Sequence, residues 1–460
     1  MRKELPEAFC ARIKRQYTTE ADILLDSISN EPNVSLRVNG IKQPEGGLDL
    51  SIERQVPWCI DGYYLRERPN YTLEPLFHAG VIYPQESSSM YIQHVLRTVE
   101  QDMPQEPTVL DLCASPGGKS LVVSSWLNGR GYLVSNEVIR QRAWILRENI
   151  AKWGGVNSIV TNLMPDELAK KTGLNVDLML VDAPCSGEGM FRKDDVAIKE
   201  WTPARAQECA DRQREILEQA WPMLKVGGYM IYSTCTFNPA ENEENVAWLL
   251  ENYDAEVVPV EYQDEWGITP KEYEGMAFLP HKVDGEGLFV CLIKKLGGRV
   301  CKAPKSKISP KRYALNGQLQ SLVPNRETYL INENRVVALP ADNKIAKEMA
   351  MVAMNGDALW CGIPVGELIK NNVLLADELP LSQGFDKSVL TKIEVDKREA
   401  LEYLHGDAVA TDGLDLPTGR AIVEYRGIPL GFVNVIAQGS TIRLNNCYPK
   451  EWRIRMRIDS

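Results

Sequence analysis

The sequence that decides the fold class is Thr108-Val109-Leu110-Asp111-Leu112-Cys113-Ala114-Ser115-Pro116-Gly117-Gly118-Lys119-Ser120. Its apolar first half, residues 108–114, is typical of a buried β-strand. The turn that follows contains a proline and two glycines, which interrupt regular structure, and an apolar helical pattern then extends from Lys119 to Leu127. A buried strand that leads through a tight turn into a helix is the unit from which parallel α/β sheets are built.

The same alternation of strand and helix patterns extends through residues 81–296, which predicts an α/β domain with a largely parallel sheet. Counting the strand at 108–114, seven strands are predicted, and the last two are expected to be antiparallel. The other six strands are Tyr132–Val138, Ser158–Leu163, Asp177–Ala183, Tyr229–Thr236, Ala255–Val260 and Gly287–Lys295. Further helices are predicted at Arg140–Trp153, Asp211–Leu224 (broken by Gly227-Gly228) and Glu241–Glu251.

The chain of 460 residues is too long for a single ordinary core. Hydrophobic residues make up 44% and charged residues 25%, which is typical of a soluble globular protein. In the last part of the chain, Val423-Glu424-Tyr425, Arg426-Gly427 and Leu430-Gly431-Phe432-Val433 predict short strands around tight turns. We expect an N-terminal accessory domain (1–80), the α/β domain (81–296), a basic linker (297–325), a first C-terminal domain (326–384) and a second one (385–460).

The formal net charge of −11 argues against a protein that coats nucleic acid unselectively, because phosphate neutralisation needs Lys and Arg. No stretch of 18 apolar residues occurs, and the N-terminus is charged, so we expect a cytoplasmic protein that does not enter membranes. One basic run without acids is interpreted as a solvated linker. Its members are Lys294, Lys295, Arg299, Lys302, Lys305, Lys307, Lys311 and Arg312.

Ten cysteines and four histidines are spread along the chain without a C-x-x-C pair or a zinc-like spacing. We therefore expect neither a disulfide scaffold nor a metal site. Most of the cysteines are interpreted as small buried apolar residues, and Cys113 in the loop is expected to pack rather than react. The buried set is Cys10, Cys59, Cys209, Cys291, Cys301, Cys361 and Cys447.

The Gly117-Gly118 loop lies where α/β sheets bind ligands, at the carboxyl ends of the strands. Glycines let the backbone approach a ligand, and the N-terminus of the following helix attracts an anionic group. The loop matches neither G-x-G-x-x-G nor a Walker sequence, and on its own a purely structural turn explains it equally well. Glu137, at the end of the next strand, can accept both hydroxyls of a ribose. Together the loop and the acid indicate an adenosyl or nucleotide ligand.

Cys185 and Cys235 differ from the other cysteines because each directly follows a strand, in Asp182-Ala183-Pro184-Cys185 and Ser233-Thr234-Cys235. These strands should be neighbours, so both thiols reach the rim where the ligand is expected. Two thiols there suit covalent catalysis. One reaction that needs such a thiol is methylation of cytosine at carbon 5. Carbon 5 is a weak nucleophile, and addition of a thiolate at carbon 6 makes carbon 5 electron-rich. After methyl transfer that thiolate must leave, which gives a second thiol a role.

At these motifs the chain resembles the RNA 5-methylcytosine methyltransferases of the NOL1/NOP2/Sun family, most closely the bacterial small-subunit ribosomal RNA methyltransferase F group. The resemblance is strong over about residues 30–296 and looser in the tail, and the paired P-C and T-C motifs make it specific. It implies a Rossmann-like seven-stranded class I methyltransferase domain, a small α+β N-terminal domain, and C-terminal α/β and PUA-like RNA-binding domains. The matching segments are residues 83–90, 111–120, 182–190 and 232–246.

The resemblance implies a monomeric S-adenosylmethionine-dependent RNA (cytosine-5) methyltransferase that acts on small-subunit (16S) ribosomal RNA. Cys235 would attack carbon 6, and Cys185 would help to release the enzyme from the methylated base. DNA cytosine methyltransferases have their nucleophile in the P-C motif, so the separate T-C cysteine favours RNA over DNA. Asp182 would face both the cofactor and the cytosine. The cofactor-binding residues would be Cys113, Ala114, Ser115, Pro116, Gly117, Gly118, Lys119, Glu137, Asn162 and Asp182.

Three further features allow more than one interpretation. Asn162 stands where the family often has an aspartate against adenine, and its amide oxygen can still accept from the exocyclic amine. Lys193 is interpreted as a substrate contact, with a solvated side chain as the alternative. Residues 450–457 place Trp452 among cations, which suits phosphates and base stacking, and an amphipathic edge strand explains them equally well.

Two other functions have to be weighed against this one. A nicotinamide-dependent oxidoreductase could use a similar sheet, but the absence of G-x-G-x-x-G argues against it. A non-catalytic ribosome-binding or assembly factor could retain the fold, and the presence of Cys185, Cys235 and Asp182 argues against that alternative. Methyl transfer therefore remains the favoured function.

Overall fold

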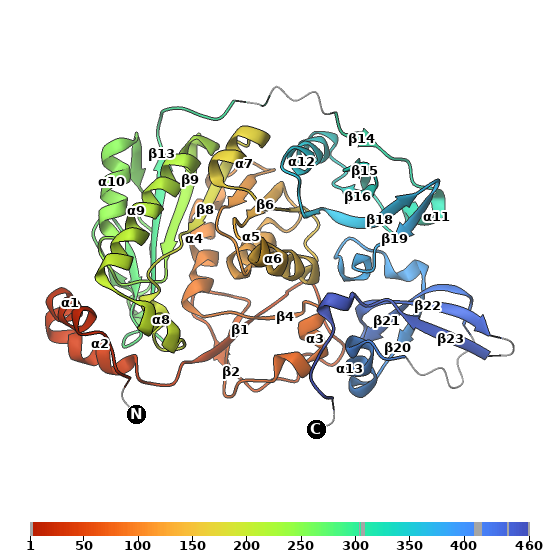
Figure 1. Ribbon diagram of the computed structural model, residues 1–460, viewed down its shortest axis with the longest axis horizontal. Coiled ribbons are helices and arrows are strands. Elements are labelled where there is room, and N and C mark those ends of the chain that lie inside the picture. Colours follow the sequence, from red (N-terminus) through yellow and green to blue (C-terminus); the bar gives the residue numbers. More distant parts are fainter. Residues whose placement is uncertain (1–2, 303, 305–308, 409–415, 439–440, 459–460) are drawn as a thin grey trace.

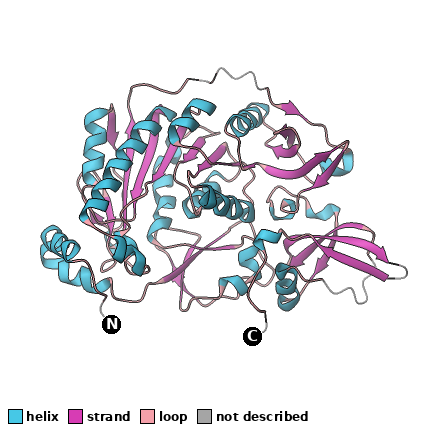
Figure 2. Cartoon of the chain, in the orientation of Figure 1, coloured by secondary structure: helices cyan, strands magenta, loops and turns pink. Residues whose placement is uncertain are grey.

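The computed structural model describes residues 3–302, 304, 309–408, 416–438 and 441–458. Along the chain it contains four β-sheets, of which the second is much the largest (Figure 1). Helices pack against both faces of this large sheet, as the colouring by secondary structure makes plain (Figure 2). Among the described residues, none of the helices has the length and apolar character needed to cross a membrane.

The large sheet has the strand order β11-β12-β13-β9-β8-β5-β6-β7-β17, and β10 pairs with β13. Strands β5 to β9 are parallel, while β13 runs antiparallel to both β9 and β10. All seven predicted strands are present, and three short additional ones extend the sheet to ten. The strands are β5 (Thr108–Asp111), β6 (Tyr132–Asn136), β7 (Ser158–Thr161), β8 (Val176–Asp182), β9 (Leu224–Thr234), β10 (Ala255–Val257), β11 (Thr269–Pro270), β12 (Met276–Phe278), β13 (Leu288–Lys295) and β17 (Trp360–Cys361).

Side chains alternate across β5, so that the sheet is buried on both faces. Leu110 joins a core with Leu217, whereas Val109 joins another core with Val95 and Val122. Hydrophobic burial on both faces is the main stabilising contribution to such a three-layer arrangement. The helices of this region are α4 (Ile92–Val99), α5 (Gly118–Leu127), α6 (Arg140–Trp153), α7 (Pro165–Thr172), α8 (Asp195–Glu200), α9 (Pro203–Ala220) and α10 (Glu243–Asn252).

Helix α9 and strand β9 differ from their predicted bounds. The helix begins eight residues earlier than predicted, at Pro203, because the Thr202 side chain caps it by accepting from the backbone of Arg205. The two glycines were expected to break this helix before the strand, and that prediction was wrong. Gly227 lies inside β9 with φ 81°, where the register between β8 and β9 is irregular. The two glycines therefore accommodate a β-bulge in β9.

The N-terminal region packs three helices and a four-stranded sheet against the large domain. Its strand order is β2-β3-β1-β4, and β4 leads directly into the segment that borders the functional site. The elements are α1 (Glu7–Tyr17), α2 (Ala21–Ser27), α3 (Pro75–His78), β1 (Val34–Val38), β2 (Ile52–Gln55), β3 (Gly62–Leu65) and β4 (Ile82–Pro84).

Two smaller sheets follow the large one. A tight turn at Arg426 and Gly427, both with positive φ, joins β21 to β22 and confirms the predicted hairpin. The third sheet contains β14 (Lys311–Arg312), β15 (Glu327–Ile331), β16 (Arg335–Leu339), β18 (Ile363–Ile369) and β19 (Asn372–Leu375), with helices α11 (Gly317–Ser321) and α12 (Asn343–Asn355). The fourth contains β20 (Thr391–Glu394), β21 (Gly419–Tyr425), β22 (Ile428–Gln438) and β23 (Thr441–Asn446), with α13 (Lys397–His405).

The basic run at 294–312 is not a uniform solvated linker, which corrects the interpretation of its first residues. Lys294 and Lys295 belong to β13, and the Lys295 side chain is buried. Its ammonium donates to the carbonyls of Trp221, Leu224 and Arg299, so it satisfies backbone acceptors at the edge of the core. Two other members, Lys305 and Lys307, lie outside the described residues.

Candidate functional site

The loop between β5 and α5 is fixed by its neighbour α6. Ser115 donates through its hydroxyl to the Arg142 carbonyl (2.9 Å), and the Arg142 guanidinium donates back to the Ser115 carbonyl (2.8 Å). Gly117 has φ 122°, and a Cβ there would lie 3.3 Å from the Leu146 side chain. The loop therefore needs glycine for its conformation and follows closely the surface of α6.

A cavity of about 390 Å³ opens beside this loop at the carboxyl ends of β5, β6 and β8. Glu137 lies at its wall, buried, where its carboxylate accepts from the Ile139 backbone (2.9 Å) and lies 3.5 Å from the Arg142 guanidinium. Val138, Ile139 and Met164 also line the cavity and remain about half exposed. The cavity therefore fits an adenosyl group. The Glu137 carboxylate can accept from the ribose hydroxyls, and the adenine ring can cover the apolar side chains beside it.

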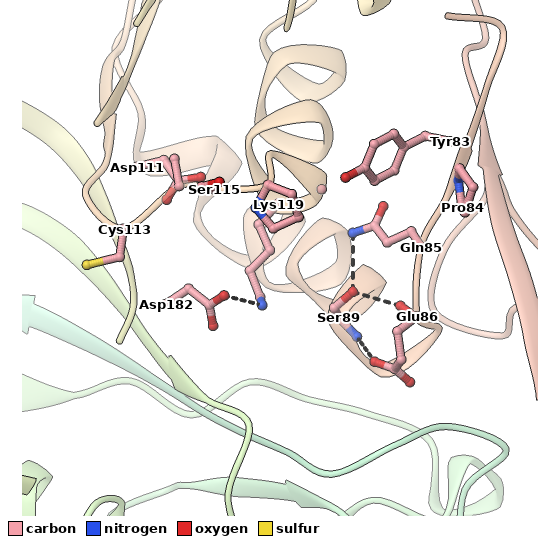
Figure 3. Close-up of a pocket in the computed structure, with 13 residues that line it drawn as sticks. Tyr83, Pro84, Gln85, Glu86, Ser89, Asp111, Cys113, Ser115, Lys119 and Asp182 are labelled. Atoms are coloured by element: carbon pink, nitrogen blue, oxygen red, sulfur yellow. Dashed lines mark hydrogen bonds and ion pairs between the residues drawn. The ribbon is translucent and has the colours of Figure 1, made fainter. Parts of the chain in front are cut away.

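A second cavity of about 160 Å³ shares Cys113, Ser115 and Asp182 with the first (Figure 3). Across it, the Lys119 ammonium lies 2.7 Å from one Asp182 oxygen, and the Ser233 hydroxyl donates to the other at 2.9 Å. Burial lowers the pKa of Lys119, but the adjacent Asp182 carboxylate more than offsets this, so the pKa is raised and the ammonium stays charged. The site thus holds a fixed, partly buried charge pair.

The opposite wall of the second cavity comes from the segment after β4 (Figure 3). Glu86 accepts from the Ser88 and Ser89 backbones, both at 2.8 Å, and Gln85 donates to the Ser89 hydroxyl at 3.3 Å. Asp111 also lines this cavity, and burial raises its pKa to about 7, although the Ser120 hydroxyl donates to it at 2.6 Å. The resemblance to known sequences included residues 83–90 without giving them a role, and the structure places them on this wall.

The two motif cysteines, Cys185 and Cys235, both line the first cavity. Their sulfur atoms are 2.9 Å apart, and the Cys235 backbone donates to the Cys185 sulfur at 3.3 Å. The hydrogen bond with Cys235, burial and the negative charge of a Cys235 thiolate together hold the pKa of Cys185 well above its usual range. The two sulfur atoms are thus close enough to share a hydrogen bond, in which either thiol can be the donor.

Most of the expected site residues line one of the two cavities. The exceptions are Gly117, which faces α6, and Asn162, whose amide donates to the carbonyls of Glu137 (2.6 Å) and Val138 (3.0 Å). Asn162 thus shapes the loop around Glu137, and its contact with adenine stays a prediction. Those that line a cavity are Cys113, Ala114, Ser115, Pro116, Gly118, Lys119, Glu137, Asp182, Cys185 and Cys235. Burial raises the pKa of Cys113, which keeps its thiol protonated.

The structure bears on two residues outside the central motifs. The Lys193 ammonium lies 3.4 Å from the Glu286 carboxylate and lines neither cavity, and its contact with substrate stays a prediction. Trp452 was considered for base stacking, but it is buried against Tyr448, and its segment is a 3-10 turn rather than a strand. Of the cations in the described part of this segment, Lys450, Arg455 and Arg457 are exposed, where they could meet a polyanion.

Sequence reasoning missed two buried carboxylates that hold the cysteine loops, Glu188 and Glu241. Arg12 of α1 lies 2.6 Å from Glu188, and Glu188 in turn accepts from the Phe237 backbone at 3.1 Å. Both acids lie inside the motif segments, yet nothing in their spacing separates them from the solvated acids around them. Among the described residues, no group of three His, Cys, Asp or Glu side chains is placed to hold a metal ion.

Three family models match successive parts of the chain. Residues 5–87 match the N-terminal domain of 16S rRNA methyltransferase RsmF, residues 97–294 match 16S rRNA methyltransferase RsmB/F, and residues 390–454 match the methyltransferase RsmF PUA domain. These matches confirm the expected combination of an N-terminal domain, a methyltransferase domain and a PUA domain.

Relatives of similar length support the same assignment. The ribosomal RNA small subunit methyltransferase F of Vibrio campbellii is 30% identical over 489 residues, covering 97% of both chains, and that of Escherichia coli is 29% identical, covering 97% of this chain and 96% of the other. A methyltransferase homologue from Pyrococcus horikoshii aligns in structure with a TM-score of 0.52 and 27% identity over 63% of this chain and 95% of that one. The archaeal NSun6 structure with SFG gives 0.54 and 20% over 64% and 99%, which supports the fold alone. The chain therefore belongs to the 16S rRNA methyltransferase RsmB/F family.

Proposed function

We propose that this protein transfers a methyl group from S-adenosylmethionine to carbon 5 of a cytidine in small-subunit ribosomal RNA, through a covalent bond between Cys235 and carbon 6. The observation that carries the proposal is the pair of thiols, 2.9 Å apart, in the lining of an adenosyl-compatible cavity. A methyltransferase that acts on a nitrogen or oxygen atom has no need of a thiol nucleophile, whereas carbon 5 of cytosine does.

S-adenosylmethionine is the cofactor of this methyltransferase family, and it would lie along the loop at 113–119 with its ribose on Glu137 and its adenine between Val138, Ile139 and Met164. When bound, it supplies an electrophilic methyl group. The residues of the chain hold it and exclude water. The half-exposed apolar side chains around the cavity become covered in the process, which contributes favourably to binding.

The first step is the attack of a Cys235 thiolate on carbon 6 of the cytosine. The sulfur–carbon bond forms, and the electron pair of the double bond between carbons 5 and 6 moves to make carbon 5 nucleophilic. Cys185, with its raised pKa, stays a thiol and donates to Cys235 before the attack. Such a neighbour stabilises the thiolate without itself competing for the base.

The charged pair of Asp182 and Lys119 is well placed to hold the edge of the base. Asp182 lines both cavities, so a base beside it lies next to the cofactor and the thiols. A carboxylate accepts from the exocyclic amine of cytosine, and an ammonium donates to its ring nitrogen or carbonyl oxygen. The base must first leave its stack, as it does for other enzymes that perform chemistry on nucleobases.

The last step reverses the first. After carbon 5 has gained the methyl group, a base removes its remaining proton, the electron pair re-forms the double bond, and the bond to Cys235 breaks. Cys185 then protonates or shields the departing sulfur atom. Cys235 performs the attack and Cys185 assists its release, so release depends on the distance between the two sulfur atoms.

The proposal is tested by locating the transferred methyl group. Purified protein is incubated with methyl-labelled S-adenosylmethionine and unmethylated small-subunit ribosomal RNA, and the RNA is digested to nucleosides. We expect label in 5-methylcytidine only. Label in any other nucleoside, or in none, would overturn the assignment of carbon 5. A parallel reaction with DNA of the same sequence is expected to remain unlabelled.

A further inference from the structure

We infer that Glu241 is a positioning residue that sets the place of Cys185 relative to Cys235, and so controls release of the enzyme from the methylated base. This inference rests on the proposed function, because release has a meaning only if Cys235 forms a covalent bond with RNA. Glu241 lies between the T-C motif and helix α10 (Glu243–Asn252), and it does not line either cavity. Its side chain therefore acts through other residues rather than on the base.

The Glu241 carboxylate is completely buried and bonded at both oxygens. One oxygen accepts from the Ser186 backbone (2.8 Å) and from the Gln213 amide (3.0 Å), and the other accepts from the Ser186 hydroxyl (2.5 Å). Ser186 is the residue directly after Cys185. A bidentate hold on the backbone and side chain of one residue fixes the P-C loop more firmly than either bond alone.

The same carboxylate also connects the P-C loop to the T-C loop. The Ser186 hydroxyl lies 3.0 Å from the hydroxyl of Thr236, which directly follows Cys235. Gln213, which donates to Glu241, donates to the Pro184 carbonyl as well, again at 3.0 Å. Glu241 is thus connected to both neighbours of Cys185, directly to Ser186 and through Gln213 to Pro184. Through the Ser186 hydroxyl it is also connected to Thr236, the residue after Cys235.

Burying a carboxylate costs free energy, and an apolar side chain could pack in the place of Glu241 without that cost. Its hydrogen bonds to the P-C loop therefore suggest a positioning role. Burial raises the pKa of Glu241 to about 7, while the bonds from Ser186 act in the opposite direction. Other groups that sense its charge are Glu188, Cys185, Cys209 and Tyr232. None of these four groups is a cation, and among the described residues the carboxylate is held by hydrogen bonds from Ser186 and Gln213.

The test is the Glu241→Gln variant of the full chain. Gln has only one accepting oxygen, so its amide nitrogen must face the Ser186 hydroxyl, which then accepts instead of donating. The charge-assisted bonds are lost, so the P-C loop should be held less firmly and Cys185 should be placed less precisely beside Cys235. We expect attack and methyl transfer to persist, while release slows by about 10- to 100-fold. The readout is the fraction of protein linked to ribosomal RNA on a denaturing gel, measured together with single-turnover methyl transfer and calorimetric binding of S-adenosylhomocysteine.

Two variants serve as references. Glu243→Gln changes an acid two residues away whose carboxylate faces Lys271 at 3.8 Å rather than the cysteine loops, and it should behave as the native protein. Cys185→Ser should accumulate the RNA adduct by direct loss of the release group. If Cys185→Ser forms no adduct, the proposed function fails; if it does and Glu241→Gln behaves as the native protein, the inference on Glu241 alone fails.

The remaining outcomes also decide the matter. A parallel loss of adduct, methyl transfer and cofactor binding in Glu241→Gln would mean a general structural role and would overturn the inference. If that variant does not fold, Ser186→Ala replaces it, because this change removes the hydroxyl bridge to Thr236 but keeps the backbone bond to Glu241. It should give an intermediate adduct level, and a native level would reject the inference.

Discussion

The glycine loop and the two cysteine loops both follow parallel strands of the same sheet, but they are held in place differently. The glycine loop is fixed by its own turn and by α6, the helix of the next strand-helix unit, through Ser115 and Arg142. The cysteine loops are fixed by side chains distant in sequence, among them Arg12, Gln213 and Glu241. Cofactor binding thus depends on local geometry, whereas the covalent chemistry depends on long-range packing.

The largest effect that separates the two regions is expected for Asp182→Asn. The change leaves the Lys119 ammonium without its 2.7 Å partner and removes the carboxylate that would hold the base edge. Methyl transfer should fall by about 100- to 1000-fold, a cost typical of a lost electrostatic group in an active site. The measurement is the single-turnover rate on ribosomal RNA.

A matched control lies at the other end of the same strand. Asp177 also has a lysine partner at 2.7 Å, Lys225, but far from the cavities. Asp177→Asn should keep the native rate at temperatures where it is folded. Equal losses in the two variants would show that the strand as a whole, and not the site, responds.

The next effect in size is expected for Arg12→Met, which removes the link between α1 and the cysteine loops. Glu188 is buried, so losing its partner at 2.6 Å should cost about 3 kcal/mol of stability. The single-turnover rate should fall by about tenfold, because the T-C loop loses a support, whereas affinity for S-adenosylhomocysteine should not change. Thermal unfolding, kinetics and calorimetry measure the three quantities.

Lys14→Met on the same helix is the control, because its ion pair with Asp22 is 3.7 Å long and well exposed. It should leave stability and turnover nearly unchanged. A weakened cofactor affinity in Arg12→Met would contradict the separation of the two regions.

Gly117→Ala should show the opposite pattern, with a weaker effect on chemistry than on cofactor binding. Alanine at φ 122° is strained, and its Cβ would crowd Leu146. With a strain of about 1 to 2 kcal/mol, affinity for S-adenosylhomocysteine should drop about tenfold. Gly129→Ala, also at positive φ but with open space around it, should lower stability without changing the affinity.

The smallest effect is expected from Arg455 and Arg457, which are exposed directly after the segment that matches the PUA domain, residues 390–454. Changing both to Glu should weaken RNA binding and reduce its dependence on salt, because fewer phosphates would be neutralised. Cofactor affinity should stay native. An unchanged salt dependence would remove these arginines from the RNA-binding surface.

The same contrast explains how much could be predicted from the sequence. The glycine loop, Glu137, α6 and the two thiols follow from local patterns, because strand ends in a parallel sheet meet at one edge. The seven main strands could also be predicted, because each is a short apolar run that turns or helical patterns separate from the next. Three short strands were not predicted, because two or three residues, such as Trp360 and Cys361 in β17, are too few to show a periodicity.

The supports of the cysteine loops could not be predicted for a different reason. Glu241 and Glu188 are surrounded by other acids in the sequence, and only the packing of α1, α9 and α10 reveals which carboxylates are buried. Likewise Trp452 looked suited to base stacking until its burial was known. The sequence shows the chemical type of a charged or aromatic residue, but whether that residue is buried or exposed depends on the packing of distant elements.

The measurement that tests the central claim most directly compares covalent RNA adducts of two single variants. Cys185→Ser and Cys235→Ser are each incubated with S-adenosylmethionine and unmethylated small-subunit ribosomal RNA, and then analysed on a denaturing gel. The account predicts a stable adduct for Cys185→Ser and neither adduct nor 5-methylcytidine for Cys235→Ser. Adducts of equal yield in both variants, or an adduct only in Cys235→Ser, would contradict it.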